Sequence, residues 1–116
     1  MCVSSQIEIE ATKRRVTVRI GNTTIAESTR AQRMTEGDLP VRHYLPSEDV
    51  MMEMLEPSET ITHCPYKGDA RYWNVTVEGS EFKDMVWSYS TPLEEVSAIA
   101  GLLCFYDERV SLEVGE

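Results

Sequence analysis

The 116-residue sequence has no long apolar run, no closely paired cysteines and few basic residues. Its apolar runs all fall short of the roughly 18–20 residues that a helix needs to cross a bilayer. The N-terminal residues show no basic stretch followed by an apolar one, so no signal peptide is expected. We therefore predict a protein that makes no contact with membranes.

The three cysteines, Cys2, Cys64 and Cys104, are odd in number and widely separated. Such spacing is not that of a secreted disulfide framework, and it favours reduced thiols and a cytoplasmic location. No Cys-x-x-Cys pair is present, and His43 and His63 are too few for a histidine-rich site. We therefore expect no metal.

Signatures of standard nucleotide-dependent and hydrolytic enzymes are also absent. The sequence contains no P-loop, no G-x-G-x-x-G, no His-Glu-x-x-His and no G-x-S-x-G. We therefore expect no cofactor, and whether the protein is an enzyme stays undecided at this point.

Acidic residues outnumber basic ones by 20 to 11, which gives a net charge of −9. A general phosphate-backbone binder needs a basic footprint, so nucleic acid is excluded as a partner. The charge is uneven, since residues 1–43 hold seven Lys and Arg against five acids and residues 44–116 hold four against fifteen. The cations that remain leave room for a small anionic ligand.

Hydrophobic patterning predicts one domain over residues 1–116, with residues 1–6 as a flexible tail. Alternation of apolar and polar residues is typical of strands with one buried face. It predicts short strands at 7–10, 16–20, 23–26, 41–45, 60–63, 70–78, 82–89, 102–106 and 110–114. Residues 28–40 are interpreted as a polar connection.

Two short helices are expected between the strands. Ser47 is a plausible N-cap for a helix that Pro57 ends, and Thr91-Pro92-Leu93-Glu94 has the form of a capping box for a helix that Gly101 ends. Because the strands follow one another through tight turns, they should pair antiparallel. The predicted fold is mainly β (α+β), a curled antiparallel sheet or partly open barrel.

The segment from Thr62 to Trp73 is the densest in chemically active residues. A nearby cation lowers the pKa of a thiol, so Lys67 in a Pro/Gly turn would make Cys64 a catalytic nucleophile. The alternative is a buried structural Cys64 with Lys67 in solvent, and this is the commoner situation for a free cysteine. Lys67 as a ligand for an anion is about as well supported as Lys67 in solvent.

Several other polar residues are candidates with a structural alternative. Glu48 and Asp49 are adjacent acids suited to acid/base catalysis, but stabilisation of a helix N-terminus explains them without any ligand and is the favoured interpretation. Arg30 matches carboxylate and phosphate groups, or it forms a surface ion pair. Rings with polar edges suit both core margins and pocket walls, and they belong to Tyr44, Tyr72, Trp87 and Tyr89.

The order and spacing of these motifs resemble a bacterial and fungal family, domain of unknown function 427, over roughly residues 16–114. The resemblance rests on Ser28-Thr29-Arg30-Ala31, Tyr44-Leu45-Pro46-Ser47-Glu48-Asp49-Val50, Thr62-x-Cys64-Pro65-x-Lys67-Gly68-x-Ala70-x-Tyr72-Trp73, Trp87-Ser88-Tyr89-x-x-Pro92, and Ile99-x-Gly101 leading to Phe105-Tyr106. It implies a small β-rich fold of the Mss4-like or β-tent kind. It implies no established activity.

Two hypotheses follow from the sequence. In the first, the motif residues line one pocket for a small anionic or polar molecule. Arg30 and Lys67 would hold the ligand's anionic group, Glu48 or Asp49 would accept hydrogen bonds or act as a base, and Tyr72, Trp87 and Tyr89 would complete the site. In the second, the protein is a non-catalytic module for protein–protein interaction. The oligomeric state is not predicted.

Overall fold

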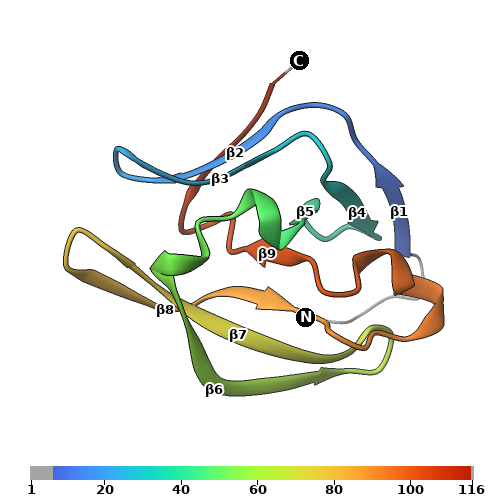
Figure 1. Cartoon of the computed structure of the whole chain (residues 1–116). Coiled ribbons are helices and arrows are strands. Elements are labelled where there is room, and N and C mark those ends of the chain that lie inside the picture. The colour runs from blue at the N-terminus through green and yellow to red at the C-terminus, as the bar shows by residue number, and fades with distance from the viewer. Residues whose placement is uncertain (1–6, 116) are drawn as a thin grey trace.

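The computed structural model describes residues 7–115, in which ten strands form two open antiparallel sheets (Figure 1). The larger sheet has the strand order β1-β4-β5-β9-β8-β7-β6, and the smaller has the order β10-β2-β3. The strands are β1 (Ile7–Ala11), β2 (Val16–Ile20), β3 (Thr23–Ser28), β4 (Gln32–Glu36), β5 (Arg42–Leu45), β6 (Leu55–Cys64), β7 (Gly68–Val77), β8 (Ser80–Ser88), β9 (Leu103–Phe105) and β10 (Ser111–Val114). The mainly β, open antiparallel prediction is confirmed, and the predicted tail at residues 1–6 lies outside the described residues.

The two faces of the large sheet bury two different sets of residues, because successive side chains of a strand point to opposite faces. Leu45 and Phe105 belong to a core shared with Val16, Val18 and Ile25 of the small sheet. The neighbouring Tyr44 and Cys104 belong to a second core, which includes Met34, Tyr89, Val96 and Ile99. The small sheet therefore covers one face, and residues between β8 and β9 cover the other.

Short 3-10 turns stand in place of the two expected helices. In the region of the first helix they are η1 (Ser47–Asp49) and η2 (Met52–Met54), and in the region of the second the turn is η3 (Glu94–Ile99). Neither expected cap forms, since η1 and η3 begin after Pro46 and Leu93 without a side-chain capping bond. Non-helical dihedral angles at Val96 further interrupt η3. Of the apolar residues that suggested helices, Val50, Val96 and Ile99 are buried. Met51 and Leu93 are exposed.

Two strands differ from the sequence prediction. Residues 32–36, expected within a polar connection, form β4, which pairs with β1 and β5. Strand β6 begins at Leu55 and passes through Pro57, which had been expected to end a helix. Proline is tolerated there because β6 is at the edge of the sheet, and the pairing with β7 is irregular between Pro57 and Ile61.

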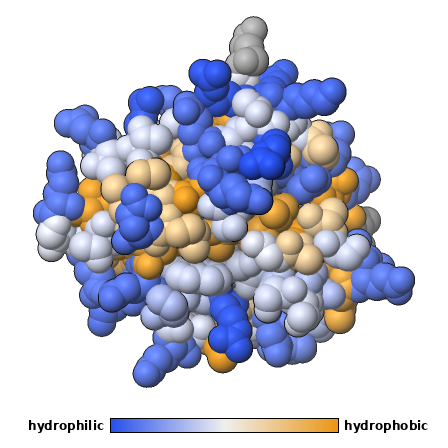
Figure 2. All heavy atoms as spheres, viewed as in Figure 1, coloured by the Kyte–Doolittle hydropathy of each residue, from blue (hydrophilic) through white to orange (hydrophobic). Residues whose placement is uncertain are grey.

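Figure 2 shows hydrophilic residues around the margin of one face and apolar residues in a band across its middle. Within residues 7–115, no helix has the length and apolar character that crossing a membrane requires.

Candidate functional site

Four of the predicted site residues meet at one pocket on the face of the large sheet opposite the small sheet. The register of β5, β9, β8 and β7 places Tyr44, Cys104, Trp87 and Tyr72 in one cross-strand row. A pocket of about 220 Å³, here called the Trp87 pocket, opens over this row. It is lined by Glu36, Leu39, Pro40, Arg42, Tyr44, Lys67, Tyr72, Trp87, Tyr89, Tyr106 and Glu108.

A buried ion pair lies in this pocket. Lys67 Nζ donates a hydrogen bond of 2.7 Å to Glu36 Oε1, and the two side chains are only 7% and 6% exposed. The same ammonium lies 5.9 Å from the centre of the Tyr89 ring. Removing two charges from water is costly unless they are paired, so each residue needs the other in this position.

The turn before β7 fixes the position of Lys67. Its backbone N–H donates to Cys64 O, and its carbonyl accepts a hydrogen bond from Leu93 N at 3.0 Å. The following Gly68 has a φ of +114°, and a Cβ there would meet Pro92 Cα and Thr91 O at 3.4 Å. The positive φ therefore favours glycine at this position, and the 91–93 segment holds Lys67 from the other side.

Aromatic rings form the walls of the pocket. Trp87 Nε1 donates a hydrogen bond to Tyr44 Oη at 3.2 Å. The centre of the Trp87 ring lies 6.4 Å from the centre of the Tyr72 ring and 5.2 Å from that of the Tyr106 ring. Burial raises the pKa values of the Tyr44 and Tyr89 hydroxyls well above their usual range. These two hydroxyls therefore stay protonated at physiological pH, when each can both donate and accept a hydrogen bond.

Arg42 closes one side of the pocket. Its guanidinium lies 5.2 Å from the centre of the Trp87 ring and 5.7 Å from that of Tyr106. Its Nη1 and Nη2 donate to the two carboxylate oxygens of Glu108 at 3.0 and 3.3 Å. Burial works against this charge, but the Glu108 hydrogen bond helps to raise the pKa of Arg42 overall. This fork-to-fork pairing fixes the guanidinium plane over the rings.

Sequence reasoning had not selected several of these residues. Tyr44 was named among the rings that suit a pocket wall but was not assigned to the site. Tyr106 stands in a motif that carries the family resemblance, so that signal was available for it. Glu36 and Arg42 stand in stretches interpreted as a connection and a strand, and no sequence pattern there indicates their partners.

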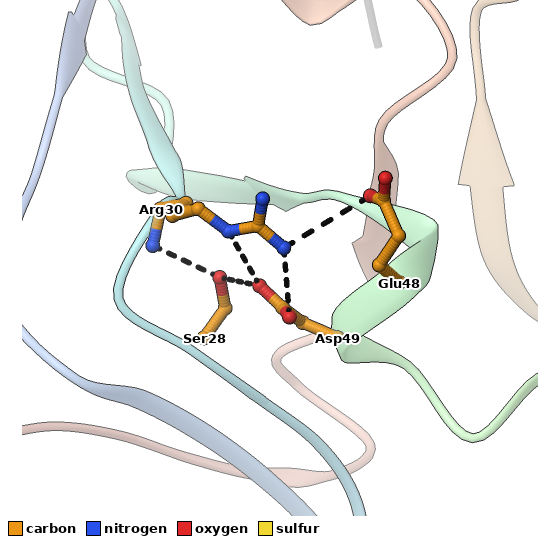
Figure 3. A network of polar contacts seen from close by, with 4 residues as sticks. All are labelled: Ser28, Arg30, Glu48 and Asp49. Atoms are coloured by element: carbon orange, nitrogen blue, oxygen red, sulfur yellow. Dashed lines mark hydrogen bonds and ion pairs between the residues drawn. The ribbon is translucent and has the colours of Figure 1, made fainter.

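Arg30, Glu48 and Asp49 form a separate cluster, shown in Figure 3. Asp49 accepts hydrogen bonds from Arg30 at 3.0 and 3.3 Å and from the buried Ser28 hydroxyl at 2.6 Å. Glu48 lies 4.0 Å from Arg30 and is largely exposed. The Arg30 and Ser28 hydrogen bonds lower the pKa of Asp49.

The expectation of one pocket containing both Arg30 and Lys67 is therefore corrected. Arg30 and Asp49 line a different hollow, which shares no described residue with the Trp87 pocket. The contacts of Asp49 join the end of β3 to η1, which is sufficient to explain the cluster structurally. A catalytic role for Glu48 or Asp49 stays a prediction.

Cys64 is outside the set of residues that line the Trp87 pocket. It is 3% exposed and disulfide-bonded, which departs from the expectation of reduced thiols. A nucleophilic role for Cys64 requires the reduced thiolate and stays a prediction. Cys104 is free and buried, and burial raises the pKa of its thiol well above its usual range.

No cluster of three or more His, Cys, Asp or Glu side chains in residues 7–115 is placed to hold a metal ion. The expectations of no metal and no cofactor stay predictions.

A family described as a domain of unknown function, DUF427, matches residues 8–116 and so covers nearly the whole chain. No curated protein matches the sequence.

Proposed function

Since this chain belongs to the DUF427 family, whose description assigns no activity, its function has to be argued from its own residues, and we propose that it binds a small polar molecule in the Trp87 pocket. The observation that carries the proposal is the buried Lys67–Glu36 pair in a cavity walled by aromatic rings. Small-molecule sites are typically concave and largely aromatic or apolar, with a few convergent polar groups.

Burying an ion pair in a protein interior has a large desolvation cost. Replacing a buried pair by apolar residues of similar volume is often neutral or stabilising, so stability alone is a weak reason for its presence. In the Trp87 pocket the pair borders a cavity, where its charges are available to a ligand. Recognition of polar groups accounts for both the position and the cost of the pair.

The size of the pocket limits the ligand. Pockets for drug-sized molecules measure about 300–1,000 Å³. At about 220 Å³ the Trp87 pocket suits a smaller molecule, with a flat part between the rings of Tyr72, Trp87 and Tyr106 and a polar end toward Lys67 and Glu36.

The test is a thermal-shift screen of small polar metabolites against two matched variants. A ligand that binds only the folded state raises the Tm by mass action. Tyr106 and Tyr66 are similarly exposed, at 37% and 39%, but only Tyr106 lines the Trp87 pocket. We expect a compound whose shift is lost in Tyr106→Ala and retained in Tyr66→Ala.

A second measurement reports on the pocket directly. The protein has two tryptophans, so Trp73→Phe leaves the fluorescence of Trp87 alone. The compound should change that fluorescence in a saturable way. The proposal is wrong if no compound raises the Tm, or if every active compound acts equally on Tyr106→Ala and leaves Trp87 fluorescence unchanged.

A further inference from the structure

The ligand class of the Trp87 pocket can be argued from which polar groups there already have partners. This argument rests on the proposed function. Both cations that line the pocket are paired with carboxylates, Lys67 with Glu36 and Arg42 with Glu108. An anionic ligand would have to compete with these carboxylates for each cation. The pairing of Lys67 therefore removes the main reason for expecting an anion.

The groups left without partners are hydrogen-bond acceptors. Glu36 is 4% exposed, and its Oε2 has no hydrogen-bond partner among the residues that the structure describes. Asp107, which follows the pocket residue Tyr106, has a buried Oδ1 that likewise has no hydrogen-bond partner among the described residues. A buried acceptor without a donor costs about 1–3 kcal/mol, and more when it is charged. A ligand that brings N–H donors would relieve this cost.

The walls of the pocket already hold cations on their faces. Arg42 lies over the rings of Trp87 and Tyr106, and Lys67 lies near that of Tyr89. The negative face of an aromatic ring attracts such charges, most strongly where water is excluded. The net charge of −9 adds a field that draws cations toward the protein.

We propose that the Trp87 pocket binds a small organic cation, an amine or amidine on a flat apolar body, whose N–H groups donate to the carboxylate of Glu36. The flat body packs against Tyr72 and Trp87. Lys67 stays on Glu36 Oε1, and the ligand takes Oε2, so that both oxygens of the buried carboxylate receive a donor.

The experiment compares three probes that share a phenethyl group and differ in the charge of the group at its end: phenethylamine, 2-phenylethanol and 3-phenylpropionate. Binding is measured by Trp87 fluorescence in the Trp73→Phe protein, with ¹H–¹⁵N chemical-shift mapping to locate the probe. We expect phenethylamine to bind at least tenfold more tightly than 3-phenylpropionate, with the alcohol between them. In Glu36→Gln the preference for the amine should fall several-fold, and in Glu56→Gln, at an exposed carboxylate outside the pocket, it should be unchanged.

The outcomes separate this inference from the proposed function. Equal or tighter binding of 3-phenylpropionate in the pocket overturns the cation inference and leaves small-molecule binding intact. If none of the three probes perturbs the pocket, the cation inference is also wrong, and the metabolite screen alone decides the proposed function. The ratio of the amine and acid dissociation constants in the protein with its native Glu36 decides the ligand class even if Glu36→Gln does not fold.

Discussion

Lys67 Nζ and Glu36 Oε1 are 2.7 Å apart, although Lys67 directly precedes β7 and Glu36 ends β4. Strands β5, β9 and β8 lie between those two strands in the sheet. In a flat sheet, four strand spacings of about 4.8 Å would separate them by about 19 Å, more than the two side chains can span. The contact therefore requires a sheet that curls around the Trp87 pocket.

Because each buried charge depends on the other, single substitutions of the pair should cost more than a double one. Lys67→Met or Glu36→Leu leaves one unpaired buried charge and should lower the free energy of unfolding by about 3–5 kcal/mol. The double variant should recover most of that loss. Urea unfolding of the four proteins measures this. A double variant as unstable as the sum of its singles would show that the pair is not the main interaction at this position.

Gly68→Ala should destabilise the protein more than Gly79→Ala does. Both glycines have positive φ, +114° and +82°, so both substitutions introduce backbone strain of about 1–3 kcal/mol. The φ of Gly68 lies farther than that of Gly79 from the left-handed region near about +57° that other residues can adopt, so alanine is more strained at Gly68. The new Cβ at Gly68 would also lie 3.4 Å from Pro92 Cα and Thr91 O, at the short end of ordinary contact distances, which leaves little room to relax. Thermal unfolding of both variants gives the comparison. Equal losses would mean that the 91–93 segment shifts freely.

The cluster in Figure 3 should respond as a structural contact. Asp49→Ala leaves the buried Ser28 hydroxyl without its acceptor and should lower the free energy of unfolding at pH 7 by about 1–3 kcal/mol. Arg30→Ala should change the free energy of unfolding little. The pKa of Asp49 is lowered in the folded protein, so its contribution is present above pH 4 and is lost as the pH falls further. Unfolding at pH 7 and pH 3 checks both points. If Asp49→Ala is as stable as the parent at pH 7, a structural role for the cluster is excluded.

Asp107→Asn should stabilise the protein at neutral pH. Burial raises the pKa of Asp107 to about 6, against the opposing effect of Arg42. Between about pH 4 and pH 6 the folded state keeps a proton that the unfolded state releases, so this group lowers stability as the pH rises through that window. At pH 7.5 the free energy of unfolding of the variant should be higher by up to about 3 kcal/mol, because a pKa shift of about two units corresponds to about that free energy. The gain should vanish toward pH 4. A gain that is constant with pH would contradict the assignment to Asp107 ionisation.

Cys104 should not react with iodoacetamide in the folded protein. It is fully buried, and burial raises the pKa of its thiol, so little thiolate is present at pH 7. Peptide mapping after alkylation should find Cys104 modified in 6 M guanidinium chloride and unmodified in buffer. Rapid labelling in buffer would mean that β9 opens frequently.

The sequence was most informative where neighbouring residues determine structure. Alternation of apolar and polar residues identified β2, β7 and β8, and burial alternates over much of β7. In β2 the three residues 16–18 are all buried, and in β8 the neighbours Met85 and Val86 are both buried. Strand β4 was missed because Gln32, Arg33 and Glu36 are polar, and a strand in the middle of a sheet is not expected from such residues. The apolar period near Met51 and Met54 matched a helix, but packing against the sheet favours short 3-10 turns followed by β6.

The same distinction applies to the candidate site. Local sequence features were sufficient to select four of the pocket residues. A Pro/Gly turn indicated Lys67, and aromatic rings with polar edges indicated Tyr72, Trp87 and Tyr89. Glu36 was not selected, because its importance comes from a partner 31 residues away that only the curled sheet brings near. Arg30 was grouped with Lys67 because both are cations, and no sequence pattern showed that they line different hollows.

Strand β6 has a consequence for the behaviour of the protein at high concentration. It is ten residues long, and within residues 7–115 no strand pairs with its outer side. Such an edge would ordinarily allow a second molecule to extend the sheet. Pro57 offers no N–H to such a molecule, the pairing irregularity that follows bends the strand, and Glu56 and Glu59 place like charges on it. Growth of fibrils or ladders from this edge is thereby obstructed, and the protein can remain dispersed without a partner chain to cap it.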